Sequence, residues 1–117
     1  MIDDNLDSIE STAELLRYFN YETHTATDGS QGVHLVAEIQ PQLILCDIGL
    51  PDMDGYQLLP LLQQAAADRK TIIAAVTGYG YAEDHQRSKE AGFDAHLVKP
   101  IDAQSLLAFV AQQVANY

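Results

Sequence analysis

Three short apolar runs that each end at a polar residue constrain the fold of this chain more than any other feature. The runs and their polar ends are Leu43–Cys46 before Asp47, Ile72–Val76 before Thr77, and Leu97–Val98 before Lys99. Continuous apolar runs of this kind are typical of strands buried on both faces of a parallel sheet. Segments with helical periodicity separate the runs. The alternation predicts an α/β domain in which helices cover both faces of a parallel sheet.

Apolar residues recur every three to four positions in the segments between the runs, which predicts helices there. These segments are residues 6–19, 33–39, about 55–65 and 106–114. The residues expected to cap them are Asn5 or Asp7, Asp28, Asp54 and Asp102. Pro60 is expected within about the first turn of its helix, where a missing N–H costs least. A further helix, with almost no apolar stripe, is expected over residues 82–91 and ends at Gly92.

Composition and charge argue against a nucleic-acid-binding protein and against a membrane-spanning one. The chain has 117 residues, which is close to the usual size of one domain. Its 17 acidic and 6 basic residues give a net charge of −11, which disfavours direct binding to nucleic acid or to a membrane surface. No apolar run approaches the roughly 18 residues of a membrane span. The single cysteine, Cys46, is expected to pack in the core, and its lack of a disulfide partner agrees with a cytoplasmic location.

A pair of acidic residues, Asp3 and Asp4, follows Met1-Ile2 in the same way as the other polar residues follow their strands. The carboxyl ends of parallel strands share one edge of the sheet, so three carboxylates, a hydroxyl and an ammonium should converge there. Two carboxylates about 4 Å apart repel by ~1 kcal/mol in water and by ~4 kcal/mol at an effective dielectric of 20. Gathered carboxylates therefore raise each other's pKa or recruit a hard cation that takes oxygen ligands.

Four motifs together resemble the signature of response-regulator receiver domains, the phosphoacceptor domains of two-component signalling. They are Asp3-Asp4-Asn5, the run from Asp47 to Gly55, Thr77-Gly78, and Val98-Lys99-Pro100. The resemblance extends over essentially the whole chain, so residues 1–117 are expected to form one receiver domain. It implies a flavodoxin-like, doubly wound five-stranded parallel sheet of order 2-1-3-4-5 with five helices.

The same resemblance implies phosphorylation of Asp47 by a histidine kinase or a histidine phosphotransfer protein. It also implies a Mg²⁺ ion held directly by Asp4, mostly through water by Asp3, by Asp47, and by the backbone carbonyl of Gly49. A carboxylate such as that of Asp47 can act as a nucleophile toward phosphorus. An ammonium at the same edge, that of Lys99, can neutralise charge on the transferred phosphoryl group.

Two further residues are expected to take part in a conformational switch. Thr77 offers a short hydroxyl donor to a phosphoryl oxygen. His96 lies three residues before Lys99, where the family usually carries an aromatic ring that moves on activation. Histidine is a variant found there in receivers attached to hybrid sensor histidine kinases. With the polar segment from Gly78 to Ala91, these residues are expected to form the surface that partners recognise.

The chain departs from the family pattern at both ends. Only Met1 and Ile2 precede the acidic pair, although a central strand usually has about five residues. Either upstream residues are missing or the first strand is unusually short. No output domain follows Tyr117, so the chain is expected to be a stand-alone receiver or one cut from a longer parent chain.

Other interpretations of the same residues stay open. Taken singly, each polar residue is more typical of a turn or a cap than of a functional site, and Asp52 and Asp54 are expected to be solvated loop acids. A phosphatase related to the haloacid dehalogenases would also use an aspartyl nucleophile, but it places a second carboxylate two residues later, where this chain has Gly49. A phosphorylation-independent interaction module would be expected to have lost Asp4, Asp47 or Lys99.

Overall fold

The computed structural model describes residues 1–50, 52–67, 70–78, 89–99 and 101–115. Within these ranges the helices are α1 (Leu6–Tyr18), α2 (Gly29–Ile39), α3 (Gly55–Ala65) and α5 (Ala103–Ala115). The strands are β1 (Leu43–Asp47), β2 (Ile72–Thr77) and β3 (Ala95–Val98). Residues 89–91 are also helical, and Gly92 follows them with a φ of 111°. The predicted α/β alternation is confirmed.

The three strands form a parallel sheet in the order β1-β2-β3. Ile2 extends this sheet, because it forms one parallel bridge to Cys46 in β1 and another to Ala26 on its opposite side. The sheet therefore runs from Ala26 through Ile2 to β1, β2 and β3, which is the predicted order 2-1-3-4-5. In the described residues, however, the first two of the five expected strands are each reduced to a single bridge.

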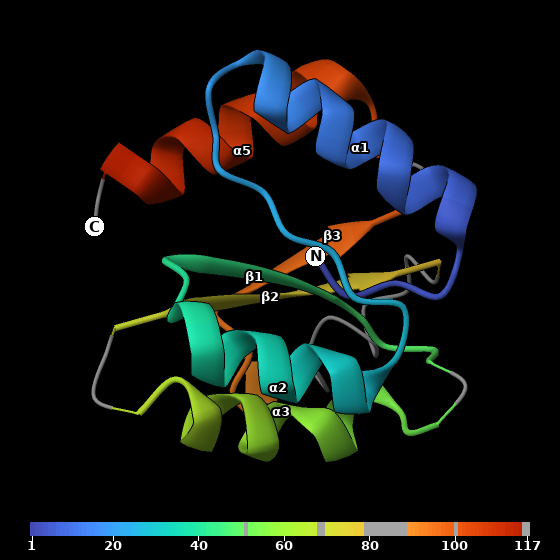
Figure 1. Cartoon of the computed structure of the whole chain (residues 1–117), viewed down its shortest axis with the longest axis vertical. Helices are drawn as coiled ribbons and strands as arrows, with labels where there is room; N and C mark the ends of the chain where they lie inside the picture. Colours follow the sequence, from blue (N-terminus) through green and yellow to red (C-terminus); the bar gives the residue numbers. More distant parts are fainter. Residues whose placement is uncertain (51, 68–69, 79–88, 100, 116–117) are drawn as a thin grey trace.

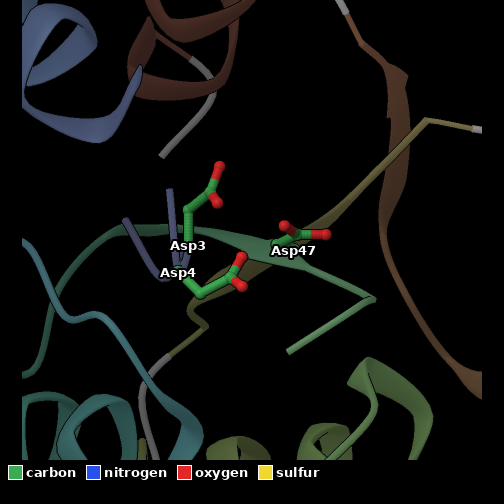
Figure 2. A group of neighbouring side chains, drawn as sticks. All are labelled: Asp3, Asp4 and Asp47. Carbon is green, nitrogen blue, oxygen red and sulfur yellow. The ribbon is translucent and has the colours of Figure 1, made fainter. Parts of the chain in front are cut away.

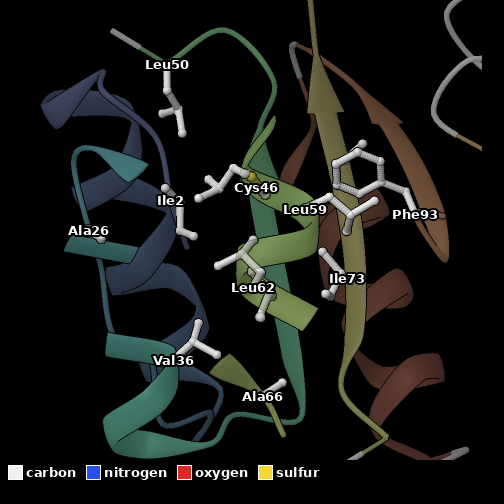
Figure 3. Close-up of a cluster of buried hydrophobic side chains, with 13 residues drawn as sticks. Ile2, Ala26, Val36, Cys46, Leu50, Leu59, Leu62, Ala66, Ile73 and Phe93 are labelled. Atoms are coloured by element: carbon white, nitrogen blue, oxygen red, sulfur yellow. The ribbon is translucent and has the colours of Figure 1, made fainter. Parts of the chain in front are cut away.

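Helices cover both faces of the sheet, with α1 and α5 on one face and α2 and α3 on the other (Figure 1). Figure 3 shows the core between the sheet and α2 and α3, which includes Ile2, Val36, Cys46 and Leu62. A second core lies on the opposite face and includes Leu16, Leu45, Ala74, Val76, Leu106 and Val110. Alternate residues of β1 and β2 enter opposite cores, as the two-residue period of a strand requires.

Cys46 lies in the core with no exposed surface, as predicted. Burial, with a smaller contribution from the neighbouring charge of Asp47, raises the pKa of its thiol to about 12. A thiol with this pKa is protonated at neutral pH and therefore unreactive.

Side-chain caps begin the helices where the sequence predicts them. Asp28 accepts from the Gln31 N–H at 2.8 Å, Asp54 from the Gln57 N–H at 2.8 Å, and Asp102 from the Ser105 N–H at 2.7 Å. Of the two candidates at α1, Asn5 is the cap and accepts from the Ser8 N–H at 3.1 Å.

This helix begins at Gly55, as predicted, but Pro60 lies in its second turn rather than within about the first. Asp54 and Gln57 form a reciprocal capping box that begins α3 at Gly55, so Pro60 is inside the helix, in its second turn. An interior proline costs about 3 kcal/mol in an isolated helix. The fully buried side chains of Leu58, Leu59 and Leu62 offset this cost by packing against the sheet.

A cavity of about 780 Å³ lies beside Met1, between residues 21–24 and residues 43–45 of β1. The hydrogen bonds of β1 alternate, since Gln42 O and Ile48 N bond to β2, whereas Leu45 O and Asp47 N bond to Ile2. The same alternation points the Leu43 carbonyl and the Leu45 N–H toward the cavity. Beyond the bridge at Ile2, β1 therefore has no strand paired on this side among the described residues.

Candidate functional site

The parallel register brings the polar strand ends to one edge of the sheet. Asp47 ends β1 opposite Val76, and Thr77 ends β2 opposite Val98. Lys99 follows β3 directly, and its backbone N–H donates to the Thr77 carbonyl at 2.7 Å. Asp3 follows the bridge residue Ile2 and lies at the same edge. The predicted convergence of these groups is therefore present.

Figure 2 shows Asp3 and Asp4 on the first segment of the chain and Asp47 at the neighbouring end of β1. One carboxylate oxygen from each of the three residues lies within 4.8 Å of the others. Asp3 and Asp47 are buried, with 8% of each residue exposed, whereas Asp4 is exposed. The cluster is thus open to solvent on the side of Asp4.

Lys99 bridges the two buried carboxylates. Its Nζ lies 2.9 Å from Oδ2 of Asp3 and 3.0 Å from Oδ2 of Asp47. Three carboxylates against this one ammonium leave an excess of negative charge at the edge.

Backbone N–H groups fix the remaining oxygens of the buried pair. The Asn5 N–H donates to Oδ1 of Asp3 and the Gly49 N–H donates to Oδ1 of Asp47, each at 3.0 Å. Asp3 and Asp47 are therefore each held at both oxygens, which orients the carboxylates before any ligand arrives.

The pKa values of Asp47 and Lys99 are both shifted by burial and by the charges around them. Burial raises the pKa of Asp47, the Gly49 N–H and Lys99 oppose that rise, and the negative charge of Asp3 adds to it. Burial alone would lower the pKa of Lys99, but the hydrogen bonds and charges of Asp3 and Asp47 outweigh it, so the net shift is upward. Lys99 therefore remains an ammonium. For Asp47, the hydrogen bonds and the charge of Lys99 do not fully offset the cost of burying the ionised carboxylate.

The cluster fits a small, hard divalent cation. Mg²⁺ takes oxygen ligands at about 2.0–2.1 Å, so oxygens on opposite sides of the ion lie about 4.2 Å apart. Carboxylate oxygens already within 4.8 Å of one another need only a small shift, or one intervening water, to share such an ion. The ligand roles of Asp3, Asp4, Asp47 and the Gly49 carbonyl stay predictions.

The expected switch residues are described only in part. Thr77 is buried at the end of β2, with 3% of the residue exposed. His96, on β3, is half-buried and pairs with Ala75 of β2. Residues 79–88 of the expected switch segment lie outside the described residues. The switch therefore stays a prediction.

Sequence reasoning missed the contacts of Asp52. This residue is exposed, as expected of a loop acid, but its carboxylate accepts from the Gly29 N–H at 2.9 Å and from the Ser30 N–H at 3.1 Å. The bond from Gly29 is the main reason that the pKa of Asp52 is lowered. Local sequence patterns do not predict contacts between residues that lie so far apart in the chain.

A lysine and three acidic residues at the carboxyl edge of a parallel α/β sheet supply the charged groups that phosphoryl transfer and its metal ion require. The family model of the response regulator receiver domain matches residues 1–111. This chain belongs to the response-regulator receiver family, whose members act in two-component systems and are phosphorylated on aspartate.

Curated relatives cover most of this chain. The transcriptional regulatory protein HprR of Escherichia coli is 32% identical over 117 residues, which span all of this chain and 51% of that protein. Protein PilG of Pseudomonas aeruginosa is 29% identical over all of this chain and 87% of its own length. The sensor histidine kinase RcsC of Salmonella typhi is 30% identical over 97% of this chain but only 12% of its own length. The chain thus spans about half of HprR.

Solved structures share the fold. A CheY-like receiver domain protein from Methanospirillum hungatei superposes with a TM-score of 0.86 at 30% identity, covering 98% of this chain and 90% of that one. A two-component response regulator from Clostridium difficile gives a TM-score of 0.89 over 97% and 92% of the two chains; at 20% identity it supports the fold alone. No helix in the described ranges is long and apolar enough to cross a lipid bilayer.

Proposed function

We propose that this chain is the phosphoacceptor receiver domain of a two-component phosphorelay and that Asp47 takes the phosphoryl group. One observation carries the proposal: Lys99 links buried Asp3 and Asp47, and the three acidic side chains converge within 4.8 Å at the carboxyl edge of the sheet. Phosphoryl transfer requires mainly positioning and charge stabilisation, and this arrangement provides both.

In the proposed transfer, a carboxylate oxygen of Asp47 forms an O–P bond as the P–N bond of a phosphohistidine breaks. The products are an acyl phosphate on Asp47 and a free imidazole on the donor. Lys99, 3.0 Å from Asp47, offers its ammonium to the phosphoryl oxygens. Thr77, on the adjacent strand, offers a hydroxyl. Mg²⁺, held by Asp3, Asp4, Asp47 and the Gly49 carbonyl, would supply further positive charge for those oxygens.

The donor is a histidine kinase or a histidine phosphotransfer protein, since receiver domains interact with such kinases. The chain resembles both a part of a sensor kinase and parts of transcriptional regulators. We therefore infer that residues 1–117 act as one domain in the cytoplasm, to which a longer parent chain could add an output domain. The domain catalyses only its own phosphorylation and dephosphorylation.

The two rival functions have less support. A phosphatase of the haloacid dehalogenase kind needs a general acid two residues after the nucleophile, and Gly49 has no side chain to supply one. A phosphorylation-independent module has no need to hold Lys99 between Asp3 and Asp47.

Intact mass after incubation with Mg²⁺ and a small phosphodonor separates these functions. A phosphoacceptor gains one phosphoryl group, a phosphatase consumes the donor in many turnovers, and an interaction module does neither. Asp47→Asn should abolish the mass increase, and Asp4→Ala should weaken Mg²⁺ binding. Normal labelling of Asp47→Asn would overturn the assignment.

A further inference from the structure

Two hydrogen bonds join the segment after β1 to the first turn of α2. The Asp52 carboxylate accepts from the Gly29 N–H with Oδ1 and from the Ser30 N–H with Oδ2. These N–H groups belong to the first turn of a helix, where no carbonyl of the helix itself can accept from them. The helix has its own cap as well, since Asp28 accepts from the Gln31 N–H. One carboxylate on α2 is thus local, and the other arrives from the segment that follows Asp47.

The side chains of Asp52 and Met53 pack tightly against Gly29. A Cβ at Gly29 would lie 3.0 Å from Cγ of Met53 and 3.2 Å from each carboxylate oxygen of Asp52. These distances are shorter than ordinary van der Waals contacts, so a Cβ at this position would require the neighbouring side chains to move by a few tenths of an ångström. Substitution of Gly29 would displace Asp52, Met53 or both.

The two ends of the same segment are also joined to each other. Gly49 forms an antiparallel bridge with Asp54, and the Gly55 N–H donates to the Ile48 carbonyl at 2.7 Å. A Cβ at Gly55 would lie 2.8 Å from Cα of Ile48, so the backbones nearly touch. Gly49 therefore lies in a segment that is closed at its base and fixed at Asp52 to a helix.

We propose that Asp52 is a positioning residue of the metal site: it fixes the segment that presents the Gly49 carbonyl by holding that segment on the N-terminus of α2. This inference rests on the proposed function, because it concerns the Mg²⁺ ion that the function requires. It gives α2 a link to the phosphorylation site through two hydrogen bonds and one short segment. Because coupling is reciprocal, an ion at the site should in turn strengthen the bonds at Gly29 and Ser30.

Asp28 provides a matched control for this inference. Asp28→Ala and Asp52→Ala each remove a carboxylate from the N-terminus of α2, and each should lower the thermal stability of that helix. Only Asp52→Ala removes the contact between α2 and the segment that carries Gly49. Any effect that arises simply from weakening α2 should appear in both variants, and thermal unfolding would measure it.

Calorimetric titration with Mg²⁺ and amide hydrogen exchange test the proposal. Asp52→Ala should raise the Kd for Mg²⁺ about tenfold, as loss of an outer contact to a metal ligand does elsewhere, whereas Asp28→Ala should change it less than twofold. In the metal-free protein, Asp52→Ala but not Asp28→Ala should speed exchange of the Gly49 N–H. Asp52→Asn, which keeps one acceptor oxygen, should lie between Asp52→Ala and the unmodified protein and serves if Asp52→Ala does not fold.

The outcomes are distinct. Equal Kd values in Asp52→Ala and Asp28→Ala, in a protein whose unmodified form binds Mg²⁺, would overturn the role of Asp52 and leave the proposed function intact. Failure of the unmodified protein to bind Mg²⁺ would overturn both.

Discussion

At the scale of single residues, Lys99 is what allows buried carboxylates to share one edge of the sheet. Its ammonium lies about equally far from Asp3 and Asp47, at 2.9 and 3.0 Å. The ammonium balances the two carboxylates in the structure, and in the proposed transfer it would instead contact the phosphoryl oxygens. Both roles need the positive charge.

Replacing Lys99 by methionine keeps much of the side-chain length and removes the charge. Lys99→Met should slow labelling by a phosphodonor about 10²-fold at saturating Mg²⁺, the usual cost of losing one charge-stabilising donor. Lys99→Arg, which keeps a cation, should retain more of the rate. The measurement is the initial rate of mass increase, and equal rates in Lys99→Met and the unmodified domain would remove Lys99 from the mechanism.

Cys46 should be unreactive in the folded domain and reactive after unfolding. Its thiol has no exposed surface and a pKa of about 12, so iodoacetamide at pH 8 should alkylate it quickly only in denaturant. Because folding raises this pKa above the ordinary value of 9.0, the contribution of the neutral thiol to stability is complete below pH 9 and is lost as the pH rises toward 12. Fast alkylation in native buffer would contradict the described packing.

At the scale of secondary structure elements, the weakest place in the sheet is the single bridge at Ile2. That residue joins Ala26 to β1, and the cavity of about 780 Å³ begins where its hydrogen bonds stop. Apolar side chains of Leu16, Val36 and Val110 line the cavity from three helices. An extended apolar segment in this space would bury its side chains against both cores.

Adding an apolar β-forming pentapeptide before Met1 should therefore stabilise the domain. The added residues would bury apolar side chains in the cavity and give β1 further backbone hydrogen bonds, and both effects should raise Tm measurably. A pentapeptide of the same length with proline and aspartate should give no such rise. Equal Tm values for all three proteins would mean that the short strand is sufficient.

Local sequence patterns predicted the elements and their caps because those interactions are local. Asp28, Asp54 and Asp102 each accept from a backbone N–H three residues later, which a pattern search can find. The bonds from Gly29 and Ser30 to Asp52 cross 23 and 22 residues, so they depend on how α2 and the segment after β1 pack together. Pro60 lies deeper in α3 than predicted, because packing of the buried leucines against the sheet offsets the cost of an interior proline.

The site could be predicted as a set of residues but not as an arrangement. The strand-end positions of Asp47, Thr77 and Lys99 follow from parallel strands sharing one edge. Nothing in the sequence specifies that Lys99 lies between Asp3 and Asp47 rather than beside Asp4. The position of Lys99 agrees with burial: Asp3 and Asp47 are buried, and a buried carboxylate costs more free energy without a charged partner than an exposed one does.

At the scale of the whole molecule, the proposed function requires phosphorylation at the edge of the sheet to change the conformation of a surface that a partner contacts. The strand ends of β2 and β3 are joined there, since the Lys99 N–H donates to the Thr77 carbonyl. A phosphoryl group on Asp47 that draws the Thr77 hydroxyl inward would change the space available to His96 on β3. Two arrangements of one surface would then exchange population.

Hydrogen exchange with and without beryllofluoride, which stands in for the phosphoryl group on Asp47, tests this switch. Protection should change between Gly78 and Val98 because the polar segment after Thr77 has little apolar surface to bury and therefore little packing stability. Changes confined to residues 30–39, with residues 78–98 unaltered, would contradict the proposed switch surface.

The central claim is that Asp47 is the phosphoacceptor, and chemical mapping of the modified residue tests it most directly. Borohydride reduces an acyl phosphate to an alcohol but leaves free carboxylates unchanged. After labelling with Mg²⁺ and a phosphodonor, reduction and peptide mass mapping should find homoserine at position 47, and should find none in Asp47→Asn. Homoserine at Asp52 or Asp54, or a stable phosphoryl group on a histidine, would contradict the account.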